Sequence, residues 1–425
     1  MKRNTISLIV IALSLFSCKK EVLQEIILTN NSDFELTDKP ISIKRNLVSS
    51  DSINHYPLLI NALDTIPSQL NDLDEDGNWD ELFFVANFSA QEKKTITLKW
   101  TNKKPNYKIR TSARFGKRES STTPVVPKTA EIMLANQLPK SIGYQQYQTD
   151  GPSWENDKVG FRHYLDGRNA KDLFGKKVST MSPEQVGINS KGAVEDNYHV
   201  MEDWGRDILA VGNSIGIGGY ALATRNELMR LGVTVNDSIN NVEKTTFKIL
   251  VEGSQKSILN YNYQNWQPNE GNRNYSVKET TTIYPGLYGY KNTVSISGIH
   301  GDESLVVGIV NINNDKELSI INENENYVAL YTHDKQTYDK KWWLGMALIV
   351  PKELYLGYTE APKTGALSNT FLAKLKIENN KPIGYYAIAG WELSDSGFVD
   401  EAFFVNYLNK VTNQLSTEID IKITN

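Results

Sequence analysis

Cysteine is almost absent from this sequence. Cys18 is the only one in 425 residues, so the chain cannot form a disulfide within itself. The five histidines are scattered, and neither a His-x-x-x-His pattern nor a Cys pair with zinc-site spacing occurs. Basic residues are not in excess, because 46 Lys and Arg face 50 Asp and Glu. These shortages argue against a disulfide scaffold, a His/Cys metal centre and a nucleic-acid partner.

Long apolar runs are also missing, apart from one stretch near the N-terminus. A basic head precedes the apolar residues Ile6 to Phe16, a stretch too short to span a membrane as a stable helix. It ends in Leu15-Phe16-Ser17-Cys18, which resembles a bacterial lipobox with Cys18 as the lipidated first residue of the mature chain. We therefore expect a lipoprotein signal peptide over 1–17 and a polar tether over 18–24.

The short β-type runs predict a mainly β chain in two parts. Runs rich in β-branched and aromatic residues, bounded by Gly, Asn, Asp and Pro, recur over 25–104 and again from about residue 245. We expect a small N-terminal β-sandwich over 25–104 and a large antiparallel β-sandwich, like a supersandwich, over 105–425. One C-terminal helix is expected from Glu401 to Leu415, where apolar residues recur at three- and four-residue steps.

An acidic turn inside the small domain has the composition of a calcium loop. Asp72, Asp74 and Asp76 alternate along the chain, Gly77 follows, and Asp80 comes shortly after. Alternate carboxylates can converge on one ion, and glycine permits the sharp turn that this requires. The segment is not an EF-hand, since its twelfth position is not Glu. We expect a structural calcium site here, with a solvated turn between strands as the alternative.

The stretch from Gly151 to Leu222 concentrates Arg, Trp, His and carboxylate residues between glycines. A core segment does not need that mixture, whereas a site for a charged, hydroxylated ligand does. Arg162 and Arg168 are the expected binding groups, because a guanidinium pairs with a carboxylate or sulfate in a fork. The large domain, 105–425, is therefore the expected catalytic domain.

His163, Tyr164 and His199 are the expected acid and base residues. A Tyr/His set can remove and return protons near neutral pH if its neighbours tune the pKa values. In a regular strand Arg162 and Tyr164 share one face and His163 lies on the other. We favour Arg162 and Tyr164 as the inward pair, with His199 supplied from the second motif.

Further residues are expected to orient these groups or to bind ligand hydroxyls. They are Glu155, Asn156, Asp203, Trp204 and Asn213. His333 and Lys335 are the next residues to consider should the first set not carry the chemistry.

Several of these motifs resemble a family of bacterial polysaccharide-utilisation lipoproteins long described only as a domain of unknown function. The similarity covers nearly the whole mature chain. It is carried by the following segments: Thr111–Phe115, Trp154–Asp157, Phe161–Asn169, Asp172–Lys176 and Tyr198–Gly219, with the acidic turn Asp72–Glu81 and the strand Leu344–Ala347.

This resemblance implies an activity, because a member of the family is an oligosaccharide dehydratase of ulvan breakdown. The implied reaction removes the C5 proton and the 4-hydroxyl of a non-reducing-end uronic acid and gives a 4,5-unsaturated uronate. The chain would then be a carbon-oxygen lyase, a hydro-lyase acting on an anionic oligosaccharide. A base, an acid and a group that stabilises the enediolate-like charge suffice for such a step, so no cofactor is expected for catalysis.

Two other functions remain open at this point. A polysaccharide lyase would use the same proton abstraction with a sugar as leaving group. A non-catalytic sugar-binding lipoprotein would bind the oligosaccharide unchanged. Product analysis separates the three, since only a lyase shortens the chain and only a dehydratase removes water without shortening it.

The lipobox predicts a membrane-anchored protein that faces the periplasm or the cell surface. Replacing Cys18 with Ala should move the protein from the membrane fraction to the soluble fraction, because lipidation supplies the anchor. Immunoblotting of the two fractions measures this. Unchanged fractionation of the variant would contradict the lipid anchor.

Overall fold

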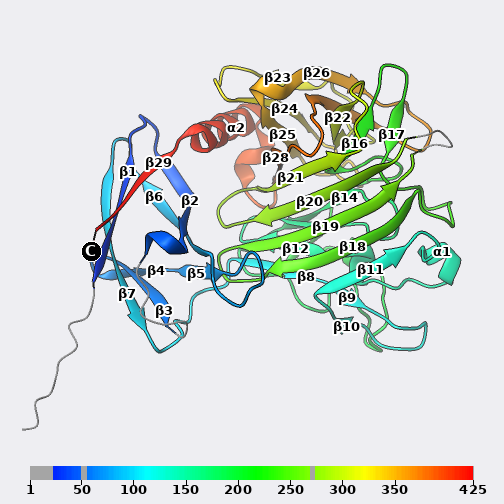
Figure 1. Cartoon of the computed structure of the whole chain (residues 1–425). Coiled ribbons are helices and arrows are strands. Elements are labelled where there is room, and N and C mark those ends of the chain that lie inside the picture. Colours follow the sequence, from blue (N-terminus) through cyan, green and yellow to red (C-terminus); the bar gives the residue numbers. More distant parts are fainter. Residues whose placement is uncertain (1–22, 49–54, 269–272, 425) are drawn as a thin grey trace, which may run out of the picture.

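The computed structural model describes residues 23–48, 55–268 and 273–424 and has a mainly antiparallel β architecture (Figure 1). In these ranges the α-helices are α1 (Pro139–Ile142) and α2 (Glu401–Ser416). The fold class expected from the sequence is thus confirmed. Within the described ranges no helix combines the length and hydropathy needed to cross a membrane. The predicted signal peptide and Cys18 lie outside the described residues.

The N-terminal part is a small sandwich of two sheets. One has the order β29-β1-β7-β3-β4 and the other β2-β6-β5. Alternating side chains such as Ile26, Leu28, Leu82 and Phe84 meet between them and form a core of their own. The strands are β1 (Gln24–Asn30), β2 (Leu36–Lys44), β3 (Tyr56–Asn61), β4 (Asp64–Ile66), β5 (Ser68–Asn71), β6 (Glu81–Phe88), β7 (Lys93–Thr101) and β29 (Ile419–Thr424).

The last strand of the chain belongs to this small sandwich. β29 pairs antiparallel with β1, with Ile423 opposite Ile26 and Ile421 opposite Leu28 (Figure 1). The expected division into 25–104 and 105–425 therefore assigns β29 to the wrong part, because residues 419–424 complete a sheet of the small sandwich. The reason is that alternation shows that 419–423 is a strand, whereas the choice of its partner depends on a contact between the two ends of the chain.

The small sandwich docks on the large one through β6, which is apolar on both faces. Leu82 and Phe84 point into the small core, while Phe83 and Val85 join a cluster with Tyr284, Leu287 and the helix α2. The Lys256 ammonium lies 4.7 Å from the centre of the Phe83 ring and 2.8 Å from Glu81 Oε2. This second buried face accounts for the continuous apolar run of β6.

The large part is built on one broad sheet. It contains nine strands in the order β11-β18-β19-β20-β21-β28-β25-β24-β23. Their bounds are β11 (Ala130–Leu134), β18 (Val242–Val251), β19 (Ser257–Trp266), β20 (Tyr275–Ile283), β21 (Gly289–Ser297), β23 (Ser319–Ile321), β24 (Tyr327–Asp334), β25 (Leu344–Pro351) and β28 (Ile383–Trp391).

Two five-stranded sheets cover one face of the broad sheet, and the main core lies between the layers. An isolated parallel bridge between Lys171 and Gly216 joins the two sheets. The first, β15-β14-β13-β12-β8, holds most of the stretch singled out from the sequence, and its strands are β8 (Thr111–Arg114), β12 (Ser153–Asn156), β13 (Gly160–His163), β14 (Lys171–Lys176) and β15 (Gly205–Asp207). The second, β17-β16-β22-β27-β26, has the strands β16 (Ile217–Ala223), β17 (Leu228–Arg230), β22 (Ser304–Val310), β26 (Tyr355–Glu360) and β27 (Thr370–Lys376).

The opposite face of the broad sheet carries α2, which contacts β24 and β25. Asp400 caps the helix by accepting a 2.8 Å hydrogen bond from the backbone N–H of Ala402. Phe404, Leu408 and Val411 are its buried apolar residues. The helix expected at 401–415 is confirmed. The remaining short elements are β9 (Gly116–Lys117), β10 (Val126–Pro127) and the 3-10 turns η1 (Arg45–Leu47), η2 (Gln148–Asp150), η3 (Asn197–His199), η4 (Lys352–Leu354) and η5 (Ser396–Val399).

The acidic turn between β5 and β6 brings three of its four expected ligands together. Carboxylate oxygens of Asp72, Asp74 and Asp80 all lie within 4.8 Å of one another, whereas Asp76 is not part of the group. The Asp76 Oδ1 atom accepts a 2.7 Å hydrogen bond from the backbone N–H of Asn78. Three clustered carboxylates repel one another, and a divalent cation would offset this repulsion. The expected calcium site stays a prediction, now centred on three of the aspartates.

This arrangement gives a thermal-stability test. With calcium at about a hundred times its Kd, binding to the folded state should add about 2.7 kcal/mol. We therefore expect a chelator to lower the melting temperature and added calcium to restore it. Asp74→Asn should weaken the response, while the neighbouring Asp76→Asn should retain it. A melting temperature indifferent to chelator would make this a solvated turn.

Candidate active site

The central strand β13 sends alternate side chains to opposite faces of its sheet. Phe161 and His163 face the main core, where the Phe161 ring packs 4.6 Å from the ring of Tyr290. Arg162 points the other way and lies opposite Asp172 of β14 in the strand register. Residues 177–204, which connect β14 to β15 and contain η3, cover this outer face, and Tyr198 lies over Arg162. A charged group there is therefore enclosed without entering the sandwich core.

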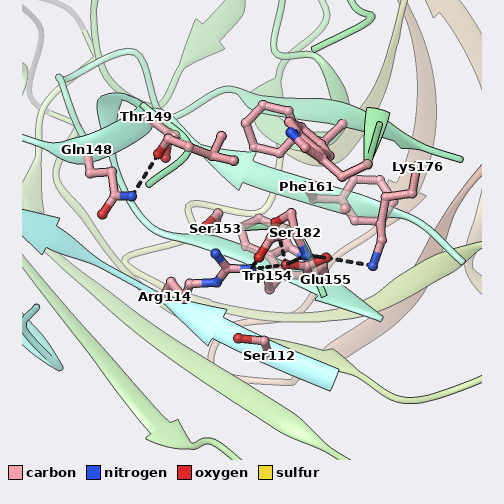
Figure 2. A pocket seen from close by; sticks show the side chains of 14 residues that line it. Ser112, Arg114, Gln148, Thr149, Ser153, Trp154, Glu155, Phe161, Lys176 and Ser182 are labelled. Atoms are coloured by element: carbon pink, nitrogen blue, oxygen red, sulfur yellow. Dashed lines mark hydrogen bonds and ion pairs between the residues drawn. The ribbon is translucent and has the colours of Figure 1, made fainter. Parts of the chain in front are cut away.

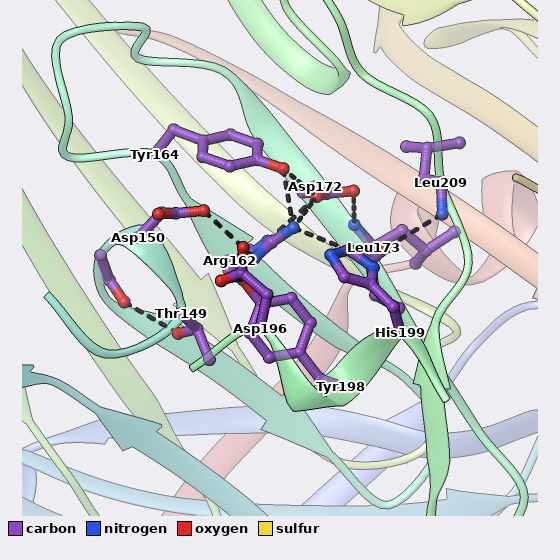
Figure 3. Close-up of polar contacts among 12 residues, drawn as sticks. Thr149, Asp150, Arg162, Tyr164, Asp172, Leu173, Asp196, Tyr198, His199 and Leu209 are labelled. Atoms are coloured by element: carbon purple, nitrogen blue, oxygen red, sulfur yellow. Dashed lines mark hydrogen bonds and ion pairs between the residues drawn. The ribbon is translucent and has the colours of Figure 1, made fainter. Parts of the chain in front are cut away.

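Arg162 is the centre of a buried ion-pair network (Figure 3). Its Nε and Nη2 donate to Asp172 Oδ2 at 3.0 and 2.6 Å, and Nη2 also donates to Asp207 Oδ2 at 2.7 Å. The Tyr164 hydroxyl accepts from Nη2 at 2.7 Å and donates to Asp172 Oδ2 at 2.5 Å. The guanidinium carbon lies 4.7 Å from the centre of the Tyr198 ring. Charge, hydrogen bonds and cation–π contacts together compensate for the burial of this cation.

A pocket of about 360 Å³ opens beside this network. Tyr164 and Arg168 form part of its wall, and the guanidinium carbon of Arg168 lies 3.5 Å from the centre of the Tyr164 ring. His199 contributes from η3, with its Nδ1 3.4 Å from Asp207 Oδ2. The lining residues are Leu138, Pro139, Lys140, Gln145, Asp150, Arg162, Tyr164, Asp166, Arg168, Asp196, Tyr198, His199, Thr234, Val235 and Asp237.

Several pocket groups have pKa values moved from their ordinary range. Burial raises the pKa of Asp150 to about 6 and that of Asp207 to about 8, and the Asp172 carboxylate adds to the rise at Asp207. Burial also raises the pKa of Tyr164 well above its usual value, so the phenol stays protonated. Burial and the Arg162 charge lower the pKa of His199. Such clustered shifts in a concave site are typical of catalytic centres.

The pocket is rich in carboxylates, and this affects the expected role of the two arginines. Arg168 is already paired with Asp166, at 2.7 Å from Nη2 to Oδ2, and Arg162 is paired with the two aspartates behind it. Both arginines line the pocket, as we expected from the sequence, but each already has an acidic partner for its charge. The four acidic lining residues are Asp150, Asp166, Asp196 and Asp237.

His163 lies outside the pocket, in contrast to the role expected for it. Its ring is buried in the main core, where Nε2 is 3.3 Å from Asn169 Oδ1 and Nδ1 is 3.3 Å from Lys171 Nζ. Burial and the Lys171 charge lower the pKa of His163 to about 3, so the ring is neutral. The alternation along β13 explains its position, because Arg162 and His163 must face opposite sides.

Glu155 belongs to a neighbouring and much smaller cavity of about 20 Å³, which has room for about one water molecule (Figure 2). Its carboxylate pairs with Lys176 Nζ at 2.6 Å and with Arg114, and accepts from Ser182 Oγ at 2.6 Å. Because Ser182 belongs to residues 177–204 and Glu155 to β12, these bonds attach that covering segment to the sheet. Asn156 has a structural bonding pattern too, since its Nδ2 donates to the carbonyl oxygens of Tyr284 and Leu287 at 2.7 Å each.

The other expected residues do not line the pocket. Trp204 packs against Phe174 with ring centres 5.9 Å apart, and Asp203 beside it is exposed. Asn213 Nδ2 donates to the carbonyl oxygen of Gly365 at 3.0 Å. His333 is buried under α2, where Nε2 lies 2.9 Å from the Phe398 carbonyl oxygen, and Lys335 is exposed nearby.

The segment Gly212–Gly216 has the Gly-x-Ser-x-Gly spacing of a nucleophile elbow. Ser214 is nevertheless fully buried, and its Oγ accepts a 3.0 Å hydrogen bond from the backbone N–H of Gly216. The segment leads into strand β16 rather than a helix. The geometry is that of a tight turn and not of an exposed serine nucleophile.

Three aspartates that the sequence analysis did not single out complete the site: Asp150, Asp172 and Asp207. A usable signal existed for one of them. A hairpin centred on Gly167 places residue 162 opposite residue 172, which is the observed register of Arg162 and Asp172. Asp207 is brought in by β15, whose pairing with β14 spans a long connection.

The raised pKa of Asp207 predicts a pH effect on stability. In the folded state Asp207 holds its proton at pH values where the unfolded chain has lost it, so its contribution to the free energy of unfolding decreases as pH rises toward about 8. Asp207→Asn retains an acceptor for Arg162 without that charge. The melting temperature of the variant relative to wild type should therefore increase from pH 5 to pH 9. A constant difference across this range would contradict the assignment.

Comparison with known proteins gives a family but no assigned activity. The chain is 26% identical over 298 residues to "Uncharacterized protein P7" of Formosa agariphila, a match that covers 65% of this chain and 68% of that protein. Two solved structures from Enterococcus faecalis, a glycosyl hydrolase family 38 protein and an alpha-mannosidase, match at TM-scores of 0.48 and 0.47 with 9% and 8% identity. Each match covers 94% of this chain and about half of the other protein, at 47% and 46%. Residues 28–421 match the family described as "Domain of unknown function (DUF4861)", and the chain belongs to this family.

Proposed function

We propose that this protein is an oligosaccharide dehydratase that removes water from the non-reducing-end uronic acid of an ulvan-type chain. The product would be a 4,5-unsaturated uronate. The observation that carries the proposal is the meeting of Tyr164 and His199 in one pocket, joined through Arg162, Asp172 and Asp207 (Figure 3). An elimination needs a base at one carbon and a proton donor at the next, and this pocket offers one of each.

His199 is suited to be the base that takes the C5 proton. Its side chain is 44% exposed, so a substrate can reach it, and its lowered pKa keeps the imidazole neutral at neutral pH. Asp207 Oδ2 lies 3.4 Å from Nδ1 and can orient the ring. The proton at C5 is acidic enough for such a base only when the adjacent carboxylate is neutralised, because the developing charge spreads onto it.

Tyr164 is suited to be the acid that protonates the departing 4-hydroxyl. Its phenol stays protonated because burial raises its pKa. When it gives up the proton, the Arg162 Nη2–H that already contacts its oxygen at 2.7 Å stabilises the phenolate. In the structure this proton is donated to Asp172, so the hydroxyl turns from Asp172 toward the 4-hydroxyl oxygen for the transfer.

The substrate carboxylate would lie between Arg162 and Arg168. The Nη1 atom of Arg162 is buried and makes no hydrogen bond in the part of the chain that the structure describes. Arg168 stacks on Tyr164 and so directs its charge toward the same side of the pocket. Two guanidinium groups beside the carboxylate would lower the free energy of the enediolate-like intermediate.

The pocket volume supports a reaction at a terminal sugar over cleavage within a chain. About 360 Å³ is near the lower end of the usual range for small-molecule sites and suits one or two sugar rings. A polysaccharide lyase that acts within a chain needs sugars on both sides of the scissile bond. It stays as the alternative, as does non-catalytic sugar binding.

Mass spectrometry of a uronate-terminated ulvan oligosaccharide before and after incubation tests the proposal. We expect the loss of one water together with increased ultraviolet absorbance of the unsaturated uronate. Tyr164→Phe and His199→Ala should each lower turnover by about a hundredfold or more, the usual scale for losing a general acid or base. Shortened chains would indicate a lyase, and an unchanged substrate that still binds would indicate a sugar-binding protein.

Matched controls exist for both variants. Tyr358 and His300 are exposed and do not line the pocket, so Tyr358→Phe and His300→Ala should retain full turnover. The melting temperature of each variant shows whether the fold is retained. Near-normal turnover in folded Tyr164→Phe and His199→Ala would contradict the assigned roles.

A further inference from the structure

Asp150 occupies an unusual position between the two arginines of the pocket. Its Oδ2 lies 3.6 Å from Arg162 Nη1 and 3.7 Å from Arg168 Nη2. Both separations exceed those of a hydrogen bond, so the carboxylate neutralises the two guanidinium groups without bonding to either. Arg162 Nη1 is buried and, among the described residues, has no hydrogen-bond acceptor. Asp150 therefore balances the charge of the two arginines, while Arg162 Nη1 keeps a hydrogen-bond donor without an acceptor among the described residues.

A strained turn holds Asp150 there. Thr149 and Asp150 have φ values of 51° and 60°, in the left-handed region that side-chain-bearing residues rarely adopt. Gly151 follows, and a Cβ at that position would lie 2.1 Å from the His163 carbonyl oxygen. The Asp150 carbonyl accepts a 2.9 Å hydrogen bond from the backbone N–H of Leu165. The backbone fixes the carboxylate in the pocket, and non-glycine strain of this kind is typical of functional sites.

The acidic lining makes this position important for an anionic ligand. A carboxylate that enters the pocket meets Asp150 in the place between the cations where it should bind. Two carboxylates at one site repel strongly unless one of them is protonated, and then a single O–H···O bond joins the pair. The pocket thus needs one proton for every carboxylate it binds.

We propose that Asp150 makes the pocket selective for a carboxylate ligand by taking up one proton as the ligand binds. The neutral carboxyl then donates a hydrogen bond to the ligand, and the facing nitrogens of Arg162 and Arg168 bind the ligand oxygens. This inference deepens the proposed function and rests on it for the identity of the ligand as a uronate. The proton comes from solvent, forms the Asp150 O–H bond, and no bond of the ligand is broken.

The charges around Asp150 agree with this behaviour. Burial, Asp166 and Asp196 raise its pKa, Arg162 and Arg168 lower it, and the result is a pKa of about 6. The groups that face it come from β13, from the loop after β13 and from the η3 region, which also contributes Tyr198 and His199 to the pocket. An added ligand charge within about 4–6 Å raises the pKa further, so the proton is taken up at neutral pH.

Calorimetric titration of the full-length protein with methyl glucuronide tests the proposal. Measured at pH 7 in Tris and in HEPES at matched ionic strength, the two apparent enthalpies should differ by the difference between the ionisation enthalpies of the buffers, multiplied by about one proton taken up. Between pH 7 and pH 8.5 the affinity of the wild type should fall by up to tenfold per pH unit. Asp150→Asn can donate an N–H without titrating, so its binding enthalpy at pH 7 should be the same in both buffers and its affinity should fall less steeply with pH than that of the wild type.

Asp237→Asn is the matched control. Asp237 also lines the pocket, but hydrogen bonds from Thr234 lower its pKa, so it stays ionised throughout. The Asp237→Asn variant should keep the proton uptake of the wild type. Methyl glucoside, which lacks the carboxylate, should show no proton uptake with any variant.

Equal enthalpies in the two buffers for the wild type would overturn the proposal, as would wild-type proton uptake at pH 7 retained in Asp150→Asn or no binding of methyl glucuronide at all. The wild-type measurement alone decides the matter if the variant does not fold. Water loss is followed separately by mass spectrometry. Proton-linked binding without water loss would contradict only the dehydratase, whereas water loss without proton uptake would contradict only the role of Asp150.

Discussion

The burial of one guanidinium group, that of Arg162, organises this site. A cation removed from water must be compensated, and here Asp172 supplies the charge, Asp207 and Tyr164 accept hydrogen bonds, and Tyr198 supplies an aromatic contact. These partners come from separate parts of the chain, namely β14, β15, η3 and the turn that follows β13. Loss of the cation would leave the Asp172 carboxylate buried without its counter-ion. The same cation therefore helps to hold residues 177–204 on the sheet through Tyr198 and contributes to the pKa shifts of Asp150, Asp207 and His199.

Local sequence patterns account for much of the fold. The two-residue alternation of strands such as 95–100 and the three- and four-residue steps of 401–415 predicted the mainly β class and the C-terminal helix, because both depend on burial of one face. Partner choice between distant strands depends on contacts that no local pattern encodes. For that reason the pairing of β29 with β1, and the division of the chain that follows from it, could not be read from the sequence.

The candidate site was predictable to the extent that one strand determines it. Alternation on β13 places Arg162 and His163 on opposite faces, and the structure has Arg162, Tyr164, Arg168 and His199 at one pocket. Asp150 could not be found in this way, because its orientation depends on the positive φ angles of Thr149 and Asp150. The local composition does not predict such a turn. Glu155 and Asn156 have the polarity of ligand-binding groups, yet their bonds are all used inside the protein.

The pairing of the first and last strands has a consequence for how the protein is made. β1 is hydrogen-bonded on one side to β7 and on the other to β29, which ends at residue 424. β29 is synthesised after every other strand that the structure describes, so the sheet that contains β1 is completed only after the strands of the large part have been made. The N-terminal strands thus lack one edge of their sheet until β29 has been synthesised.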